Sequence, residues 1–433
     1  MKLSIYNIES KIEEGLLIFN SKTSGILFLN DEYAIEYDKL KNDCNDCKKE
    51  DLIKEMKRCG MLVPDSTLEA EKVIVENNVN KYAHNIDFTI ATTMNCNFAC
   101  PYCYEDGVRY NTMNKETADK TIEFILNQVD KNTPLSIFWY GGEPLLDLKH
   151  IRYITEKLKE HSDKYESYSA SIVTNGYLLT KDVAYQLKKL DIDNVQITLD
   201  GPAKIHNERR YLKAGKKPTF ETILKNVKDC CEILNINIRA NVDKTNMSCV
   251  DELFEEFNKN GIKDKISFYI SPVSDISENP NPKCFTNLEF SKEQMEFYLR
   301  MLNKGNKIVA IPKPIYGVCS AISPFSFLID PLGDLYKCWN DVSRKEFRVG
   351  NVYTGVEYNT ALSKYLNYEA VNQEKCMHCS VLPLCLGGCP NENILLNKRE
   401  CSPLKYNASN IVEYYYALLK QDVVNTKDHV LFI

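Results

Sequence analysis

The sequence lacks the features of a membrane, secreted or nucleic-acid-binding protein. No apolar run approaches the roughly 18–20 residues that a membrane-spanning helix needs, and residues 1–15 lack the charged-then-apolar order of a signal peptide. The 54 basic residues do not outnumber the 60 acidic ones, so no general positive field attracts a polyanion. We therefore expect a cytoplasmic protein with no membrane and no nucleic acid among its partners.

Histidine is scarce, whereas cysteine is abundant. The chain has six histidines and 17 cysteines. Because disulfides do not persist in a reducing compartment, thiolates with metal-like spacing are the leading explanation for so many cysteines. The shortage of histidine favours all-sulfur sites over mixed His/Cys zinc sites.

Hydrophobic periodicity divides the chain into five segments. Within the first, an apolar hairpin at residues 16–29 precedes two helical patterns at 32–41 and 48–59. The predicted segments are a small α+β unit at 1–65, a helical linker at 66–85, a strand-and-helix region at 86–303, a cysteine-rich region at 304–405 and a helical tail at 406–433. We expect metal to replace a hydrophobic core in the cysteine-rich segment, and the tail helix to run from 406 to about 421.

The strand-and-helix region predicts a parallel sheet covered by helices, because short apolar strands alternate with longer amphipathic segments. Such sheets hold their ligands at the carboxyl ends of the strands, and the motifs described next lie at those ends. The six predicted strands are residues 86–93, 135–140, 169–174, 195–199, 236–242 and 266–272.

The first of these strands leads into a loop with three cysteines, in the sequence TTMNCNFACPYCYEDG. Cys96, Cys100 and Cys103 have the spacing C-x₃-C-x₂-C. Three thiolates on a [4Fe–4S] cube leave one iron open to an exogenous ligand. If the amino and carboxylate groups of S-adenosylmethionine (SAM) fill that position, an electron from the cluster can cleave the sulfonium bond and release a 5′-deoxyadenosyl radical. The alternatives are three buried cysteines with this spacing by chance, or part of a zinc site.

A second motif, W-Y-G-G-E-P at residues 139–144, follows the second predicted strand. Glycine permits close backbone approach there, and the Glu143 carboxylate can accept hydrogen bonds from an ammonium group, as binding of the methionine end of SAM requires. Alone, this motif would be an ordinary turn. Next to the cysteine loop, it predicts part of a cofactor site.

Together, the two motifs resemble the radical SAM superfamily over roughly residues 86–303. The resemblance implies an α/β fold, a partial (β/α)₆ barrel, with one [4Fe–4S] cluster and SAM. It also implies that Tyr102 contacts adenine, and that Gly141, Gly142 and Glu143 hold the methionine amino group.

The same resemblance assigns residues at the ends of the third and fourth strands. Thr198 and Asp200, in QITLDG, would form the ribose-side polar pair, and Arg209 or Arg210 would meet the SAM carboxylate. The sequence T-N-G at residues 174–176 ends the third strand in a similar way. A strand-end threonine or aspartate more often caps a helix, which is the alternative for these positions.

Seven further cysteines in the C-terminal region resemble the SPASM domain of peptide-modifying radical enzymes. In that family one set of four would complete an auxiliary [4Fe–4S] cluster, and the other three would leave a second auxiliary cluster one ligand short, giving three clusters in all. Two Cys₄ zinc sites are the main alternative, and they too would lack a ligand. The set of four is Cys376, Cys379, Cys385 and Cys401, and the set of three is Cys319, Cys338 and Cys389.

An auxiliary cluster with an open iron could bind a thiolate of the substrate and position its sulfur for attack by a carbon radical. The alternative is a fourth protein ligand, for which Cys284 is the nearest upstream candidate. Sulfatase-maturing relatives carry an extra cysteine in the region where this chain has Lys313, and an aspartate base where it has Trp339. Both departures argue against formylglycine formation.

The order of elements in residues 1–65 resembles a winged-helix-like unit that recognises leader peptides by adding them to a sheet edge. A packing domain without a ligand is the alternative. Cys44 and Cys47 form a lone C-x₂-C, which we interpret as incidental surface thiols. Four other cysteines lie in helical patterns and are expected to be small core residues: Cys59, Cys230, Cys231 and Cys249.

These resemblances imply a maturase that abstracts hydrogen from a Cys-rich precursor peptide with a leader and joins a cysteine sulfur to the resulting carbon radical, as in sactipeptides and ranthipeptides. An external donor of the flavodoxin or ferredoxin type would supply electrons. Other radical modifications of peptides remain open: a C–C crosslink, epimerisation or formylglycine formation. A non-catalytic electron-transfer or peptide-binding scaffold is the alternative from another class.

Substitution of one loop cysteine should separate the catalytic cluster from the auxiliary clusters. After anaerobic reconstitution with iron and sulfide, the wild type should form 5′-deoxyadenosine from SAM under strong reductant. Cys96→Ala should lose this activity and about one third of the iron, because two auxiliary clusters remain. Iron analysis and chromatography of the nucleoside measure both effects. A wild type that forms no nucleoside would defeat the enzyme hypothesis.

Overall fold

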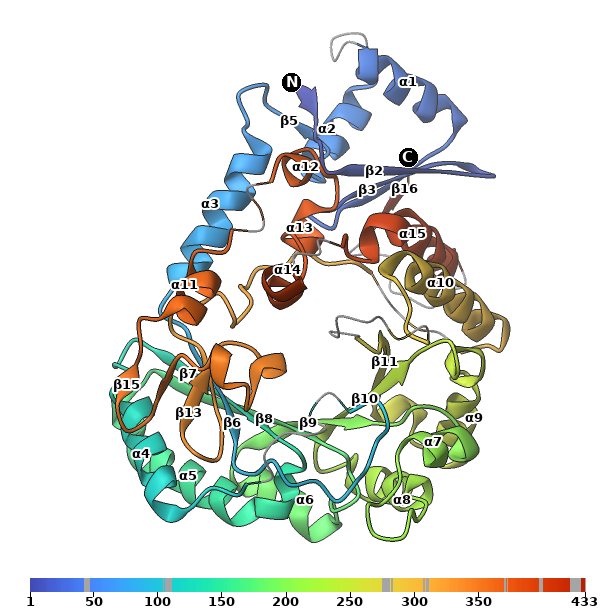
Figure 1. Cartoon of the computed structure of the whole chain (residues 1–433). Helices are drawn as coiled ribbons and strands as arrows, with labels where there is room; N and C mark the ends of the chain where they lie inside the picture. The colour runs from blue at the N-terminus through green and yellow to red at the C-terminus, as the bar shows by residue number, and fades with distance from the viewer. Residues whose placement is uncertain are drawn as a thin grey trace.

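The computed structural model describes residues 1–42, 47–103, 105, 111–274, 281, 283–306, 308, 311–369, 371, 373–396, 400–420 and 430–432. Figure 1 shows a sheet with helices along its outer side at one end of the molecule, and a small unit that holds both chain termini at the other end. In the described chain, no helix is both long and apolar enough to cross a membrane.

A ten-stranded sheet forms the centre of the larger part, in the order β11-β10-β9-β8-β7-β6-β12-β13-β14-β15. Strands β6 to β11 are all parallel, which confirms the prediction of a parallel sheet. The largest difference is at β9, which starts three residues before its predicted start. The six strands are β6 Ile86–Ala91, β7 Pro134–Tyr140, β8 Ser167–Thr174, β9 Ile192–Thr198, β10 Asn235–Val242 and β11 Ser267–Pro272.

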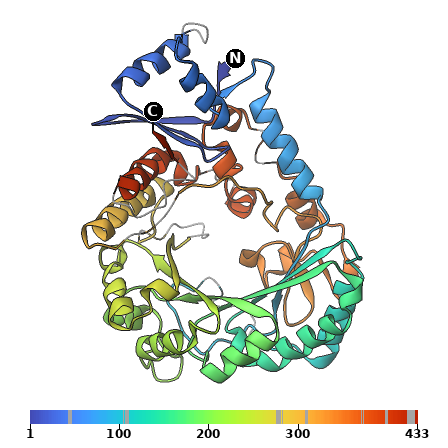
Figure 2. The same ribbon diagram turned by 180° about the vertical axis from the view of Figure 1, so that it is seen from behind.

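Helices follow each strand and cover the outer face of the sheet (Figures 1 and 2). Side-chain caps fix where three of these helices begin. Asn114 accepts from Thr117 N–H, and Thr180 accepts from Val183 N–H. Thr286 forms a capping box with Glu289. The helices are α4 Lys115–Leu126, α5 Leu148–Glu160, α6 Lys181–Lys189, α7 Ala203–Arg209, α8 Phe220–Cys230, α9 Glu252–Lys259 and α10 Asn287–Asn303. Short 3₁₀ turns add to them at Pro144–Asp147, Ser162–Lys164, Met247–Cys249 and Lys263–Lys265.

The two faces of the sheet differ in chemistry, as β10 shows. Its even-numbered residues from Ile236 to Val242 are buried in the apolar core beneath the helices. Its odd-numbered residues from Asn235 to Asn241 are polar and less buried. Since successive side chains in a strand point to opposite faces, the inner face of the sheet is polar along this strand.

The cysteine-rich region extends the same sheet, which the sequence did not predict. Strand β12 pairs in parallel with β6, and Phe327 of β12 stacks on Phe88 with ring centroids 6.5 Å apart. The cysteine-rich region therefore has part of a hydrophobic core, formed by apolar contacts with β6, where we had expected metal alone to stabilise it. The further strands are β12 Phe327–Ile329, β13 Asp334–Tyr336, β14 Gly350–Asn351 and β15 Gly355–Val356, with 3₁₀ turns at Trp339–Asp341 and Lys345–Phe347.

Five helices complete the C-terminal part. The predicted tail helix is present as α15, which packs on α10, where Tyr298 and Tyr414 stack with centroids 5.3 Å apart. Gln421, the predicted end of this helix, lies outside the described residues. The helices are α11 Thr360–Leu366, α12 Glu374–Met377, α13 Leu382–Cys385, α14 Pro390–Leu396 and α15 Leu404–Lys420.

The N-terminal unit contains the predicted hairpin and both predicted helices. Strand β2 was missed, because its sequence NIESKI has only a weak apolar alternation. The antiparallel strands β2, β3 and β4 pack on α1 and α2, and α3 leads to the larger part. The elements are β1 Lys2–Leu3, β2 Asn7–Ile12, β3 Gly15–Asn20, β4 Ile26–Leu29, α1 Asp31–Asn42, α2 Glu50–Arg58, β5 Leu62–Val63 and α3 Glu69–Tyr82.

A strand from the far end of the chain covers one edge of this small sheet. β16 (Val430–Phe432) pairs in parallel with β4, giving the order β16-β4-β3-β2. An unpaired strand edge is a template for adding another strand, so β16 satisfies hydrogen-bonding groups that β4 would otherwise expose. Among the described elements, β2 forms the opposite edge.

The cysteines outside the predicted metal sites fall into two groups. Cys59 and Cys230 are buried, as expected for core residues, whereas Cys231 and Cys249 are only half-buried. The prediction that Cys47 is a surface thiol is wrong, because it is buried in the core of the N-terminal unit, where burial raises its pKa. Cys44 lies outside the described residues.

Removal of β16 should loosen β4 selectively. In a chain that ends at Lys420, backbone amides of residues 26–28 should exchange hydrogen faster, because their parallel partners are missing. Amides of β2, on the far side of β3, serve as the internal control and should exchange at the wild-type rate. Hydrogen exchange followed by mass spectrometry measures both. Equal protection of β4 in the two chains would contradict the pairing.

Candidate functional site

The cysteine loop begins where β6 ends and is held by the loop that follows β7. Gly142 N–H donates to the Thr93 carbonyl at 3.1 Å, and Glu143 N–H donates to the Asn95 carbonyl at 2.9 Å. On its other side, Ala99 N–H donates to the Tyr211 carbonyl at 3.1 Å. Backbone hydrogen bonds therefore fix the loop between two neighbouring segments.

Two glycines make this docking possible. A Cβ added at Gly141 would lie 2.2 Å from the Thr93 carbonyl oxygen, and one added at Gly142 would lie 2.5 Å from that of Asn95. Gly141 also has a positive φ of 121°, which side chains disfavour. The glycines of the W-Y-G-G-E-P motif thus serve first to bring two loops together.

The three thiols of the loop lie close enough for their charges to interact. Burial raises the pKa of Cys96 to about 12, with further contributions from Glu143 and Cys100. Burial likewise raises the pKa of Cys103 to about 11, and Cys100 is shifted in the same direction. Without a metal, the thiols are therefore neutral at pH 7. Binding of a cluster to them as thiolates must release protons.

A cavity of about 280 Å³ opens beside the loop. Both motif glycines and several of the predicted SAM contacts line it, but Glu143 and Asp200 do not. The lining includes Cys96, Cys100, Cys103, Tyr102, Gly141, Gly142 and Thr198. The structure thus brings most of the predicted residues together around one space.

Glu143 is fully buried, and its carboxylate oxygens accept hydrogen bonds from the protein itself. Oε1 accepts from Thr174 Oγ1 at 2.6 Å and from Leu145 N–H at 3.0 Å, and Oε2 accepts from Asn175 N–H at 2.7 Å. This carboxylate therefore links the loops after β7 and β8. Its predicted contact with the SAM amino group stays a prediction.

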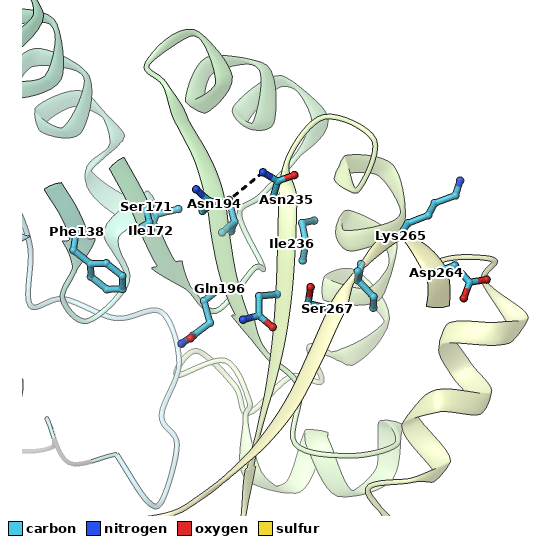
Figure 3. A pocket seen from close by; sticks show the side chains of 13 residues that line it. Phe138, Ser171, Ile172, Asn194, Gln196, Asn235, Ile236, Asp264, Lys265 and Ser267 are labelled. Carbon is cyan, nitrogen blue, oxygen red and sulfur yellow. Dashed lines mark hydrogen bonds between the residues drawn. The ribbon is translucent and has the colours of Figure 1, made fainter. Parts of the chain in front are cut away.

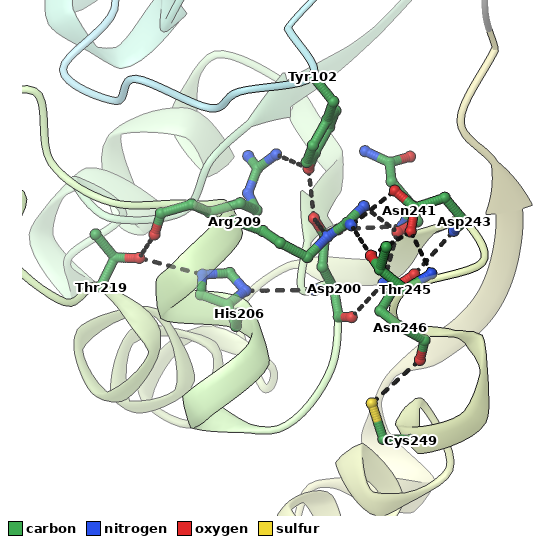
Figure 4. A network of polar contacts seen from close by, with 11 residues as sticks. Tyr102, Asp200, His206, Arg209, Thr219, Asn241, Asp243, Thr245, Asn246 and Cys249 are labelled. Atoms are coloured by element: carbon green, nitrogen blue, oxygen red, sulfur yellow. Dashed lines mark hydrogen bonds and ion pairs between the residues drawn. The ribbon is translucent and has the colours of Figure 1, made fainter. Parts of the chain in front are cut away.

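Asp200 is likewise at the centre of a buried network (Figure 4). Its carboxylate accepts from the Tyr102 hydroxyl, from Arg209 Nε at 3.3 Å and from Asn241 N–H at 3.1 Å. Arg209 also pairs with Asp243 at 2.8 Å. Asp200 thus positions Tyr102 at the cavity wall.

His206 supports this network from behind the cavity. Burial lowers its pKa well below the usual value, with Arg210 and Arg209 adding to the effect, so the ring is neutral. Nδ1 accepts from Asp200 N–H at 3.3 Å, which leaves the proton on Nε2 to be donated to Thr219 Oγ1 at 3.1 Å. Sequence reasoning did not single out this histidine.

Of the two arginines predicted to meet the SAM carboxylate, Arg210 is the available one. Arg209 is already paired with Asp200 and Asp243. Arg210 lines the cavity, donates from Nη1 to the Tyr102 hydroxyl at 2.9 Å and keeps a buried Nε with no partner among the described residues. A buried donor beside the three thiols fits a cofactor with an anionic group.

The seven C-terminal cysteines separate into two sets in space. Burial, and then Asp341, raises the pKa of Cys338, and the charges of Cys319 and Cys389 contribute to the same shift. Burial raises the pKa of Cys376, with contributions from its three neighbours Cys385, Cys379 and Cys401. This division into three and four is the one that the resemblance implied. Their role as cluster ligands stays a prediction.

The spacing of the thiols bears on the zinc alternative. Among the described residues, no three His, Cys, Asp or Glu side chains converge closely enough to hold a single metal ion. Thiolates on one zinc ion sit about 2.3 Å from the metal. The cysteines of a cube each bind a different iron and so remain further apart. The cluster prediction and the zinc alternative therefore differ in the spacing of thiols that they require.

Trp339 and Tyr140 stack on each other in the lining of the cysteine-loop cavity. The Trp339 ring stacks on Tyr140 and Phe138, with centroids 4.6 and 4.9 Å apart, and its Nε1 donates to Thr89 Oγ1 at 3.1 Å. Burial, and next the charge of Cys103, raises the pKa of Tyr140, and Cys338 adds to the shift. One phenol is thus close to both sets of thiols.

Several cavity residues were not predicted, notably Gln196, Arg239 and Asn241. Their signal in the sequence is the polar alternation along the predicted fourth and fifth strands. The predicted motifs lie at the strand ends and do not indicate which residues face the cavity along the strands.

Substitution of Gly142 should disturb the cysteine loop. In Gly142→Ala the added Cβ must displace the Asn95 carbonyl, so we expect lower thermal stability, by roughly 1–3 kcal/mol, and poor assembly of the cluster on this loop. Gly317→Ala is the matched control, because nothing lies within 4 Å of its added Cβ. Thermal unfolding and iron content measure the two effects. A fully loaded and stable Gly142→Ala variant would contradict the docking.

Comparisons with known proteins agree on one family. Residues 90–257 match the model of the radical SAM superfamily. The radical SAM cyclopropyl synthase TigE of Paramaledivibacter caminithermalis is 25% identical over 369 residues, which cover 77% of this chain and 75% of TigE. The serine-type anaerobic sulfatase-maturating enzyme of Bacteroides thetaiotaomicron is 24% identical over 392 residues, which cover 76% and 90% of the two chains.

Two solved structures share the fold. Native anSMEcpe with bound AdoMet superposes with a TM-score of 0.61 at 19% identity, covering 78% of this chain and 98% of its own. Streptococcus suis SuiB bound to the precursor peptide SuiA gives a TM-score of 0.53 at 16% identity, covering 93% and 97%. The family implies a [4Fe–4S] cluster and SAM. With the cysteine loop, the glycine motif and the parallel sheet in place, the chain contains a domain of the radical SAM superfamily.

Proposed function

We propose that this protein is a peptide maturase that joins a cysteine sulfur of a precursor peptide to a carbon of the same peptide. In this proposal Cys96, Cys100 and Cys103 hold the catalytic cluster, and the two C-terminal sets hold two auxiliary clusters. Relatives whose names describe maturation support a peptide substrate, among them the mycofactocin maturase MftC of Mycolicibacterium smegmatis, which is 22% identical over 339 residues. SuiB, which shares the fold, was solved with its precursor peptide.

The observation that carries this proposal is the position of the three-cysteine set. Cys338 is followed directly by Trp339 and Asn340, and both line the cavity that contains the cysteine loop. Tyr140 is close enough to both Cys103 and Cys338 for their charges to raise its pKa. One peptide bound in this cavity would therefore reach both the site of radical formation and the site that binds a thiolate.

When bound, the cofactors supply a 5′-deoxyadenosyl radical that takes one hydrogen atom from a peptide carbon, and an auxiliary cluster that accepts the electron released as the C–S bond forms and the thiol proton leaves. The chain's own residues hold the reactants. Arg210 would bind the SAM carboxylate, and the stacked rings of Tyr140 and Trp339 would exclude water from this part of the cavity. The peptide loses two hydrogens overall.

Formylglycine formation is the second candidate, because the sulfatase-maturating relative matches over 90% of its length. At the position where the resemblance predicts an aspartate base, this chain has Trp339, whose ring is stacked and whose Nε1 donates to Thr89. An indole cannot accept the proton. Trp339 therefore argues against formylglycine formation and in favour of the thioether. The other radical modifications of peptides are distinguished from a thioether by their products.

We further propose that the N-terminal unit binds a leader peptide, that a small iron–sulfur or flavin protein delivers electrons, and that the protein acts in the cytoplasm. A leader could add to β2, which is an edge strand among the described elements, or replace β16 on β4. Both routes use strand addition to the same small sheet.

Mass spectrometry of a coexpressed precursor tests the proposed reaction. A Cys-rich peptide encoded beside this gene should lose two hydrogens for each crosslink, and its cysteines should become resistant to alkylation. In Cys338→Ala, crosslink formation should fall at least about tenfold more than formation of 5′-deoxyadenosine, because the substitution damages only the set of three. Cys230→Ala removes a buried cysteine outside both sets and serves as the control. A modified peptide that keeps its mass and its free thiols would overturn the proposal that a thioether forms.

A further inference from the structure

The inner face of the sheet carries polar side chains that the proposed chemistry does not use. Asn194 and Gln196 of β9 stand in register with Asn235 and Asn237 of β10. Together they line a second cavity, of about 520 Å³ (Figure 3). Gln196 also lines the cavity of the cysteine loop, so the two cavities adjoin at this side chain.

Three buried polar atoms in a row on β10 have no hydrogen-bond partner among the described residues. They are Asn237 Oδ1, Arg239 Nε and Asn241 Oδ1. As alternate residues of one strand they share the inner face, and the row is about 13 Å long at roughly 3.3 Å per residue. Buried polar atoms are nearly always hydrogen-bonded to protein, ligand or ordered water, so this row indicates a place where a polar ligand can bind.

Arg239, at the centre of the row, is not paired with a carboxylate in the part of the chain that the structure describes. Its Nη2 donates to the neutral Ser271 Oγ at 3.0 Å. Its charge also acts on the Tyr140 phenol, together with those of Cys103 and Cys338. The guanidinium also lines the cavity of the cysteine loop, together with Cys103 and Trp339, where a substrate would react.

The SAM carboxylate does not account for this arginine, because Arg210 is placed for that role beside Tyr102 and the cysteine loop. Among the described residues, neither guanidinium forms an ion pair with a carboxylate, and two such groups in one cavity favour two anions. In a peptide the second anion is the side chain of aspartate or glutamate. The amide oxygens of Asn237 and Asn241 can accept backbone N–H groups, which an extended peptide presents along the same length.

We propose that the inner face of β10 is the specificity site for the substrate peptide. Arg239 binds the carboxylate of an aspartate or glutamate, and Asn237 and Asn241 accept backbone N–H groups on either side of it. This assignment rests on the proposed function, since it names the peptide chemistry that the same cavity takes.

Peptide binding tests the site without requiring turnover. Short fluorescein-labelled peptides with one cysteine and one aspartate at varied positions are compared with a matched set that carries asparagine instead. With the anaerobically reconstituted full-length protein and SAM, fluorescence anisotropy should show the best aspartate peptide binding about tenfold or more tighter than its asparagine match, because its bond to the guanidinium is charge-assisted.

The Arg239→Gln variant should bind the two sets equally, whereas Arg239→Lys should keep part of the preference, because lysine keeps the charge but loses the fork of donors. Arg152→Gln removes the same charge from the outer surface, where Arg152 donates to Gln186, and should keep the full preference. Far-UV circular dichroism verifies that each variant is folded.

A wild type without the aspartate preference, or a preference that survives Arg239→Gln, would overturn the specificity site. An equal loss of affinity for both peptide sets in Arg239→Gln would also overturn it, because Arg239 would then act through SAM or the fold. Failure of the proposed function has a different signature: the aspartate preference is present and depends on Arg239, yet no peptide is crosslinked.

Discussion

The docking of two loops on each other is the constraint on which the site depends. Gly142 and Glu143 donate backbone hydrogen bonds to the carbonyls of Thr93 and Asn95, across a contact with no room for a Cβ. This contact sets where the three thiols lie relative to the sheet. It also places Tyr140, directly before the glycines, at the cavity wall. A loop with three cysteines and no such support would have no fixed relation to a substrate.

The cysteine thiols and the arginines in and around the cavity differ in their bonding and in their charge. Burial raises the pKa values of the thiols, whereas Arg210 and Arg239 each keep a buried Nε with no partner among the described residues. Arg209, by contrast, is neutralised by Asp200 and Asp243 and belongs to the framework. Arg209 and Arg210 thus differ in their bonding although they are adjacent in sequence, and we propose ligand binding only for Arg210 and Arg239.

The parallel sheet, the hairpin and the grouping of motifs at strand ends could be predicted from the sequence, because apolar periodicity and cysteine spacing are local signals. The roles of Glu143 and Asp200 could not, since each carboxylate has a partner far away in sequence: Thr174 is 31 positions from Glu143, and Tyr102 is 98 positions from Asp200. Strand β12 was missed for a related reason: three apolar residues predict a strand only once β6 is known to lie beside them. The burial of Cys47 depends on the packing of α1 and α2, which spacing alone does not reveal.

The pairing of β16 with β4 has a consequence for the order of folding. Ile26 and Val430 are about 400 residues apart in sequence, so this contact closes one of the longest loops the chain can form. During synthesis the strands of the N-terminal unit emerge early, whereas their parallel neighbour is made only after the barrel strands. Until then the edge of β4 is open to pairing with other chains. The N-terminal unit therefore passes through an aggregation-prone interval whose length is set by translation and not by its own folding rate.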